Sequence, residues 1–343
     1  MKTRPMTAAL TPALALPLGL LLAACGTTDT GSDDKAAPKA NDSAECSADE
    51  TTTSTGPVTL TDSYGRTVEL DKPAERVAVL EWQQVEDVLT LCLTPVAVAD
   101  AEGYATWDTA EELPDGVTDV GTRGEPNLET LFGTNPDLVI VEAYTAEDEI
   151  LKQLAKYDVP VLATKGADAA DPVANMLGTF ELIAQATGRE ERAQVVVDDF
   201  NAHLAEAKEK VAATDATEFV YFDGWVQGGN VSIRPFGQGS LIGELGEALG
   251  LTNAWTGEVD EAYGLGQTDI EGMSELGDAT FFYTGTVDPE GDVNATLAEN
   301  AVWQKIPAVA EGRSHAFPAG IWTFGGPRSA EQIIDAYVDL LTK

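Results

Sequence analysis

The feature that most constrains the fold is a stretch without strand signal, residues 171–213, that separates two similarly patterned halves. Pro172 suits the first turn of a helix and Gly188 suits its end, which predicts one helix between them. Beyond Gly188, apolar residues recur at helical spacing among charged ones, which predicts a second, longer helix. We therefore expect residues 188–213 to form a single helix that connects two halves of the chain.

Each half alternates short apolar strands with helices, after an opening hairpin at 58–60 and 68–70. The expected strands are 76–81, 96–100, 137–142 and 159–164, then 218–223, 230–234, 280–284 and 315–318. The expected helices are 84–93, 127–134 and 147–157, then 240–249, 269–276, 295–311 and 329–342. Continuous apolar strands suit parallel sheets covered on both faces, so the predicted fold class is α/β. Its two lobes are 57–187 and 214–343, the second ending in a C-terminal helix, and the carboxyl ends of their strands are expected to share a cleft.

The N-terminus has the features of an export signal. Lys2 and Arg4 precede an apolar run that ends in Leu-Ala-Ala-Cys at 22–25. This order predicts a signal peptide at 1–24, and its end resembles a bacterial lipobox, which implies lipidation of Cys25. Residues 25–56 then read as a flexible acidic linker, because positions 26–56 lack large apolar side chains. We expect a lipoprotein anchored to the outer face of the cell membrane.

Two further cysteines leave the disulfide question open. Cys46 lies in the expected linker and Cys92 in the folded body. Export permits a disulfide between them. We favour the other interpretation, a free Cys92 buried in an apolar helix.

The charge balance and the motifs exclude several classes of protein. Lys and Arg number 20 against 58 Asp and Glu, a net charge of -38, so we expect no nucleic-acid partner. The turn at 237–243 lacks the glycine that a nucleophile elbow needs two residues after its serine, and no phosphate-binding loop is present. We expect a binding protein and not an enzyme.

Several aromatic residues and two arginines lie in the predicted strand-end loops. The aromatic residues are Trp82, Tyr104, Trp107, Tyr144, Trp225, Tyr263, Trp322 and Phe324. The arginines are Arg123 and Arg234. Core packing is the alternative for each aromatic, an ion pair with Glu125 or Glu129 is the alternative for Arg123, and a surface pair is the alternative for Arg234. Together they predict a wide pocket with apolar walls and few hydrogen-bond donors.

Six blocks of sequence resemble one family. They are 94–100, 103–107, 119–129 (Asp-Val-Gly-Thr-Arg-Gly-Glu-Pro-Asn-Leu-Glu), 135–140 (Asn-Pro-Asp-Leu-Val-Ile), 253–255 and 322–330. In this order they are similar to periplasmic ferric-siderophore binding proteins over residues 58–343, and the branch they resemble is the hydroxamate-type receptors of ABC importers. The resemblance implies a two-lobed binding-protein fold with one long connecting helix and little hinge motion.

The resemblance also assigns roles. Arg123 would donate to hydroxamate oxygens, Tyr144 would assist, and Trp107 and Trp322 would line the cleft. Tyr263 is the best match for a further aromatic, and Phe324 matches an aromatic that often carries a hydroxyl. Trp82, Arg234 and Trp225 complete the expected siderophore-binding set, and Glu129 and Glu271 match residues that dock on the permease. Cys92 stands where a glycine is common.

The resemblance further implies the partners. They are a ferric hydroxamate siderophore, an ABC permease and its ATPase, bound by a monomer. The siderophore fills the coordination sphere of the iron, so we expect no cofactor and no protein ligand to the metal.

The charges of the predicted cleft loops favour hydroxamate chelates. The loops hold Arg123, Arg234 and Arg328 against Glu81, Glu102, Asp108, Glu125, Glu142, Glu147 and Asp148. Tris-catecholate chelates are strongly anionic and would be repelled at distances that salt leaves unscreened. Hydroxamate chelates are neutral or cationic and avoid this cost.

Four alternatives remain open at this level. A receptor for bare metal ions would need converging ligands, but His203 is expected on the connecting helix, which leaves His315. The others are a haem or cobalamin receptor of the same fold, an exported hydrolase, and a surface adhesin.

Overall fold

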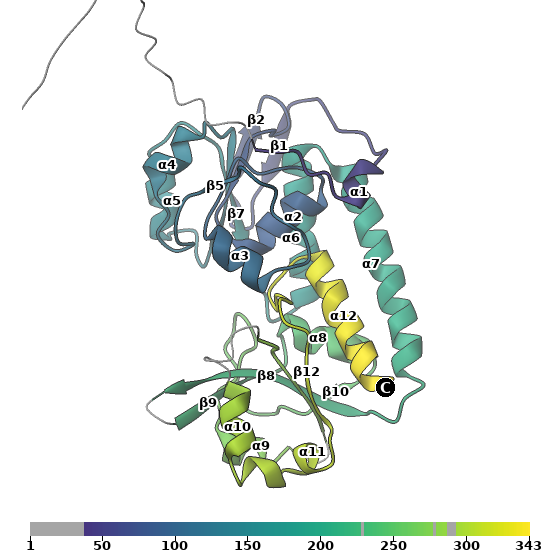
Figure 1. The fold of residues 1–343 in the computed structure, drawn as a ribbon. Coiled ribbons are helices and arrows are strands. Elements are labelled where there is room, and N and C mark those ends of the chain that lie inside the picture. Colours follow the sequence, from purple (N-terminus) through teal and green to yellow (C-terminus); the bar gives the residue numbers. More distant parts are fainter. Residues whose placement is uncertain (1–37, 228–229, 277–278, 287–292) are drawn as a thin grey trace, which may run out of the picture. The chain divides into compact units, whose positions relative to one another are not determined.

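The N-terminal lobe is built on a five-stranded parallel sheet (Figure 1). The computed structural model describes residues 38–227, 230–276, 279–286 and 293–343. The sheet has the order β5-β4-β3-β6-β7, from Thr118–Asp119, Ala97–Val98, Val77–Val79, Leu138–Ala143 and Val161–Lys165. Successive residues of β6 enter different hydrophobic clusters, Leu138 and Ile140 one and Val139 and Val141 the other. The sheet is therefore buried on both faces, as its continuous apolar strands predict.

The helices of this lobe begin directly after strands. They are α2 (Trp82–Thr90), α3 (Ala101–Trp107), α4 (Leu128–Gly133) and α5 (Glu149–Leu154). Glu81, Asp100 and Asn127 are N-caps whose side chains accept backbone N–H groups. The expected hairpin is confirmed as the antiparallel pair β1 (Val58–Thr61) and β2 (Thr67–Leu70). Helix α3 and strand β5 were not expected from the sequence.

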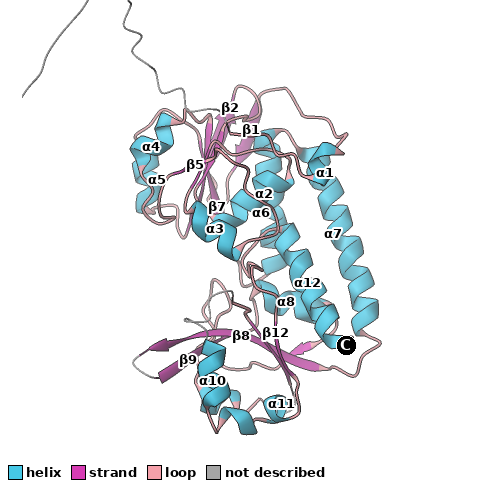
Figure 2. Ribbon diagram, in the orientation of Figure 1, coloured by secondary structure: helices cyan, strands magenta, loops and turns pink. Residues whose placement is uncertain are grey.

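The C-terminal lobe holds a second, mostly parallel sheet (Figure 2). Its strands are β8 (Glu218–Gln227), β9 (Asn230–Phe236), β10 (Thr252–Asn253), β11 (Thr280–Tyr283) and β12 (Ser314–Ala316). The parallel order is β10-β8-β11-β12, and β9 pairs antiparallel with β8. The helices are α8 (Leu241–Ala248), α9 (Ile270–Met273), α10 (Val293–Glu299), η1 (Trp303–Lys305), α11 (Pro307–Ala310) and α12 (Pro327–Leu341).

The single helix expected at 295–311 is wrong. The Asn300 side chain accepts the backbone N–H groups of Val302 and Trp303, which ends one helical segment. Pro307, which has no N–H to donate, begins the next. The chain therefore makes three short segments, α10, η1 and α11, instead of one helix.

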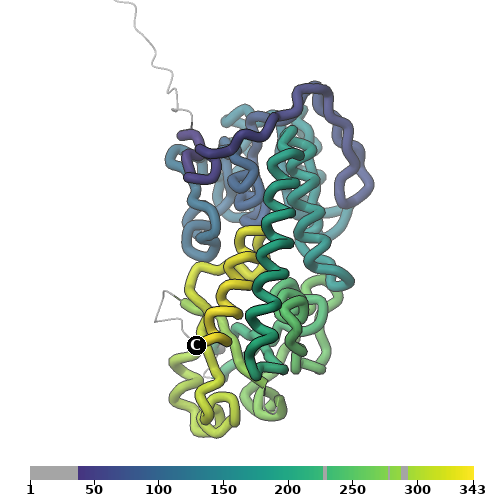
Figure 3. The backbone as a smooth tube through the Cα atoms, turned by 90° about the vertical axis from the view of Figure 1, so that its right-hand side faces the viewer, coloured from purple at the N-terminus to yellow at the C-terminus, as the bar shows by residue number. Residues whose placement is uncertain are grey.

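Two helices connect the lobes and belong to both cores. Helix α6 (Pro172–Thr187) ends at Gly188 with φ +69°, and α7 (Glu190–Val211) confirms the expected long connector. Val196 of α7 packs into the N-terminal core, whereas Phe200 packs into the C-terminal core. Figure 3 shows α7 running alongside α12, to which it is tied by a contact of 2.9 Å between His203 Nε2 and Asp335 Oδ1. A connector that is part of both cores restricts hinge motion.

The part of the expected linker that the structure describes is packed against the lobes. The signal peptide 1–24 and Cys25 lie outside the described residues, but 44–47 form a short helix, α1 (Ala44–Ser47). Glu45 pairs with Arg192 of α7 and Arg328 of α12. The expectation of a flexible linker is thus corrected for this segment, because its acidic side chains find arginine partners far away in the sequence.

A disulfide joins Cys46 to Cys92, so the favoured interpretation of a free Cys92 is wrong. Cys92 follows α2 with φ +64°, a left-handed conformation that glycine adopts most readily at a helix end. This conformation accounts for the glycine that is common at this position in the resembled family. The disulfide holds α1 against the end of α2.

A buried carboxylate joins the lobes at the start of α12. Glu86 of α2 accepts hydrogen bonds from the backbone N–H groups of Gly326, Arg328 and Ser329, each 2.9 Å long, and from Ser329 Oγ at 2.6 Å. The exposed N–H groups and the dipole of a helix N-terminus favour a negative group there. Glu86 therefore supplies from one lobe the cap that α12 needs in the other.

Other acids crowd around this cap. Asp87 is fully buried, and its oxygens have no hydrogen-bond partner among the described residues. Burial, and then the nearby Glu86, raise the pKa of Asp87 and of Asp108 well above the usual range. Burial and Glu86 also raise the pKa of Glu111 to about 7, although Arg328 opposes the rise. The acids around Glu86 thus hold protons in the folded state that they would release on unfolding.

We expect reduction of the disulfide to destabilise the fold. It closes a loop of sequence separation 46, for which a crosslink contributes about 2–4 kcal/mol to the free energy of unfolding. Urea denaturation with and without dithiothreitol measures this loss. The Cys46→Ser, Cys92→Ser double variant is the control, because it should show the lower stability and no response to reductant. Equal stability of the oxidised and reduced wild type would contradict the prediction.

Stability should fall as the pH rises from 5 to 8. Glu111 has a pKa of about 7 when folded and its ordinary value near 4.5 when unfolded, so the folded state binds more protons between these values. Its contribution is complete below pH 4.5 and is lost as the pH passes 7. Glu111→Gln should reduce the fall by roughly 1–2 kcal/mol, after allowance for solvent screening. Urea titrations at each pH test this, with the exposed neighbour Glu112→Gln as control; equal slopes in both variants would count against the assignment.

Candidate functional site

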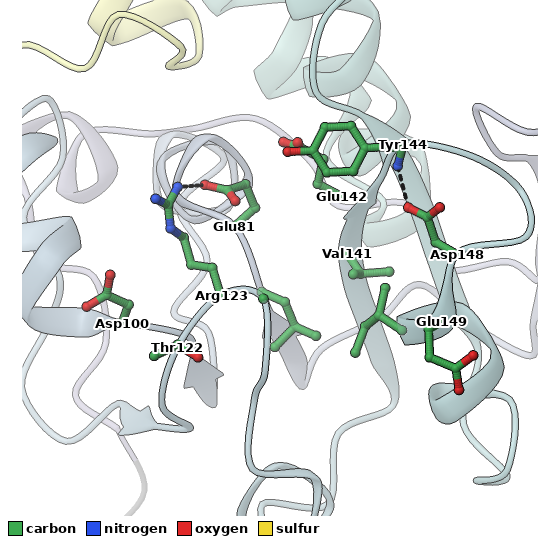
Figure 4. Close-up of a pocket in the computed structure, with 12 residues that line it drawn as sticks. Glu81, Asp100, Thr122, Arg123, Val141, Glu142, Tyr144, Asp148 and Glu149 are labelled. Carbon is green, nitrogen blue, oxygen red and sulfur yellow. Dashed lines mark hydrogen bonds and ion pairs between the residues drawn. The ribbon is translucent and has the colours of Figure 1, made fainter. Parts of the chain in front are cut away.

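A cavity of about 590 Å³ lies at the carboxyl ends of the N-terminal strands (Figure 4). It is lined by Leu80, Glu81, Asp100, Thr122, Arg123, Gly124, Val141, Glu142, Tyr144, Asp148, Glu149 and Ile150. Leu80 and Glu81 follow β3, and Glu142 lies near the end of β6. The chain order of the sheet reverses between β3 and β6, which is where open α/β sheets bind ligands.

Arg123 lies flat against aromatic rings at one wall of the cavity. Its guanidinium carbon is 3.7 Å from the ring centroid of Trp82 and 5.6 Å from that of Trp322. The guanidinium also pairs with Glu81, which caps α2 through the N–H of Trp82. The sequence-based alternative of a pair with Glu125 or Glu129 is replaced by this pair with Glu81. Cation–π contact and ion pair together fix the orientation of the side chain.

Trp82 has a structural as well as a wall position. It is buried, and its Nε1 donates to the carbonyl of Asp100 at 3.2 Å. Its ring meets that of Trp322 edge-on, with centroids 4.8 Å apart. Trp82 therefore supports Arg123 from below and contacts the C-terminal lobe at the same time.

A row of aromatic rings continues from this point into the C-terminal lobe. Trp322 contacts Phe324 with centroids 5.2 Å apart, and Phe324 contacts Tyr263 at 5.5 Å. Trp322 lies in the segment before α12, whose first turn Glu86 caps. The cap therefore sets the position of this row relative to Trp82.

Tyr263 and Glu142 connect the lobes across the cavity. The Tyr263 hydroxyl donates to Glu142 Oε1 at 2.8 Å. Burial, and then the charge of Glu81, raise the pKa of Glu142 to about 7, whereas Tyr263 and Arg123 oppose the rise. Burial and Glu142 likewise raise the pKa of Tyr263, so its hydroxyl keeps its proton. The pair places an acidic side chain beside Arg123.

The structure brings together some of the expected site residues but not all. Arg123, Trp82, Trp322, Phe324 and Tyr263 form the connected group described above. Tyr144 lines the same cavity with 74% of its surface exposed.

Two expected residues lie around a different hollow. Arg234 and Trp225 line a second cavity of about 610 Å³ in the C-terminal lobe, and Arg234 is paired with Asp223. Trp107 is partly exposed on α3, and Tyr104 is a core residue. The expected docking residues Glu129 and Glu271 are exposed on α4 and α9.

The acids were expected as charges of the cleft loops but not as parts of the binding set. Glu81, Glu142 and Asp148 line the cavity, together with Asp100 and Glu149. Their positions directly after β3, β4 and β6 are the signal that could have identified them, because those strands end at one edge of the sheet.

Two searches of the described residues found nothing. The part of the chain that the structure describes contains no group of three or more His, Cys, Asp or Glu placed to hold a metal ion. It also contains no helix that is both long and apolar enough to cross a bilayer.

Comparisons with known proteins identify the family. The model of the family described as periplasmic binding protein matches residues 77–319. The iron(3+)-hydroxamate-binding protein FhuD of Escherichia coli is 28% identical over 265 residues, which cover 76% of this chain and 84% of that protein.

Solved structures of similar fold include binders of different chelates. A siderophore-binding protein FhuD from Vibrio cholerae, bound to Fe3+ and Desferal, has a TM-score of 0.68 at 24% identity and covers 78% of this chain and 98% of its own. The triscatecholate siderophore binding protein FeuA of Bacillus subtilis has a TM-score of 0.64 at 20% identity, with coverages of 83% and 98%. These likenesses concern the fold, a pair of α/β lobes. Because the family model matches more than half of its length, the chain belongs to the periplasmic binding protein family.

Proposed function

We propose that this chain captures a ferric hydroxamate siderophore outside the cytoplasm and presents it to an ABC importer. The observation that carries the proposal is the guanidinium of Arg123, held against the rings of Trp82 and Trp322 in a cavity lined by acids. Such a side chain can donate to hydroxamate oxygens, and the aromatic row offers an apolar wall to the chelate. The role is binding, without chemical turnover.

The charge of the cavity supports hydroxamates over catecholates. The relatives do not decide the matter, because hydroxamate and catecholate binders share the fold. In the cavity, Arg123 is the single basic residue among the lining side chains, and Glu81 already pairs with it. A strongly anionic chelate would meet uncompensated carboxylates there, whereas a neutral or cationic one would not.

Aromatic burial supplies most of the expected affinity. One charged hydrogen bond contributes about 1.5–3 kcal/mol, whereas a nanomolar complex needs roughly 12 kcal/mol. Each aromatic side chain buries on the order of 150–250 Å², at about 25 cal/mol per Å². The rings around Arg123 therefore matter as much to binding as Arg123 itself.

The remaining parts of the proposal concern iron, membrane and permease. Iron is held by the siderophore alone, so the protein needs no cofactor. Lipidation of Cys25 tethers the chain, as a monomer, to the outer face of the membrane. Glu129 and Glu271, one exposed acid in each lobe, meet the permease of an importer driven by its ATPase.

Arg123→Ala should weaken binding of ferrioxamine at least about tenfold, the equivalent of losing one charged hydrogen bond. Quenching of tryptophan fluorescence in a titration measures the dissociation constant. Arg76→Ala is the matched control, because Arg76 is exposed at the amino end of β3, the opposite edge from the cavity. Wild-type affinity in Arg123→Ala would show that Arg123 serves structure alone and would remove the main support for the proposal.

A further inference from the structure

The cavity has an excess of negative charge that binding of a neutral chelate does not require. Five carboxyl groups line it, Glu81, Asp100, Glu142, Asp148 and Glu149, against the one guanidinium of Arg123. Two of them come from β6 and the start of α5 on the side away from Arg123. The acids therefore surround the space and do not merely balance the arginine.

The charge of Arg123 is already compensated. Glu81 pairs with its guanidinium, and the rings of Trp82 and Trp322 cover its faces. Arg123 can still donate N–H groups to a ligand oxygen, but it has little net charge left to attract an anion. The field that a ligand meets is therefore set by the other acids.

Glu142 is the acid most deeply placed in this field. Its Oε1 accepts the hydroxyl of Tyr263, and no hydrogen bond between described residues uses its Oε2. A side chain at position 166 would collide with it, since a Cβ on Gly166 would lie 2.3 Å from its carboxyl carbon. The carboxyl group is thus confined between Tyr263 and Gly166, with an oxygen left for a ligand.

The acids on the other side are engaged in local contacts. Asp148 accepts the backbone N–H of Tyr144 and the hydroxyl of Thr145, each at 2.6 Å. Glu149 is exposed, 3.7 Å from Lys152. They add to the negative potential, whereas Glu142 is the group placed to accept a new hydrogen bond.

We propose that the cavity prefers chelates that carry a positive charge, such as a terminal ammonium, over otherwise identical neutral ones, and that Glu142 is the residue that determines this preference. The inference rests on the proposed function, because it concerns the ligand of the same cavity. An ammonium donates to a carboxylate and gains from a site of low dielectric, whereas its acetylated form keeps the shape and loses the charge.

The test compares two ligands that differ by this one group. They are ferrioxamine B, which has a free terminal amine, and its N-acetyl derivative, titrated at pH 8 in low salt. Glu142 is ionised there because its pKa is about 7. Wild type should bind the amine form at least about tenfold more tightly, a difference of ~1.4 kcal/mol. Added salt should reduce this ratio, because it screens the charge.

Variants then locate the preference. Glu142→Gln keeps an oxygen for the Tyr263 hydroxyl and removes the charge, so the ratio should fall to about threefold or less. Glu69→Gln makes the same change of net charge at an exposed position on β2 and should leave the ratio unchanged.

The outcomes separate the two proposals. Failure of the wild type to bind either chelate would contradict the proposed function. Equal affinity of the wild type for both chelates would overturn the charge preference while leaving the proposed function intact. An unchanged ratio in Glu142→Gln would overturn the role of Glu142. The wild-type comparison needs no variant, so poor folding of Glu142→Gln would not prevent a result.

Discussion

The arrangement of the two lobes depends on one buried carboxylate. Glu86 belongs to the N-terminal lobe, yet it accepts the first N–H groups of α12, which follows the C-terminal sheet. A helix N-terminus without partners and a buried carboxylate without partners are each costly, so each stabilises the other. Because Trp82 lies one turn before Glu86 and Trp322 lies just before α12, the same contact brings these two rings together.

The cavity inherits its chemistry from this frame. Once Trp82 and Trp322 are in place, Arg123 stacks on them and pairs with Glu81, which leaves it oriented and neutralised. The carboxylates at the ends of the neighbouring strands then determine the sign of the potential. The aromatic row and the charge thus do different work, the first supplying contact area and the second selecting the class of ligand.

Relatives with the same fold are named for chelates of opposite charge character. A shared fold therefore sets where the ligand lies, at the carboxyl ends of the strands, but not which ligand it is. Selectivity must come from side chains at those ends. In this chain they include Glu142, held by Tyr263 of the other lobe. The connecting helices α6 and α7, shared by both cores, keep such contacts in register.

The sequence by itself determined what depends on local pattern. The connecting helix, the hairpin and the buried strands follow from apolar spacing and from end signals such as Pro172 and Gly188, and most of the aromatic row was named from its loop positions. Tertiary structure alone decided the pairing of residues distant in the chain. It selected Glu81 as the partner of Arg123, joined Cys46 to Cys92, and ordered the acidic segment through Arg192. Such pairs leave no periodic trace, because each is set by how whole elements pack and not by the residues beside it.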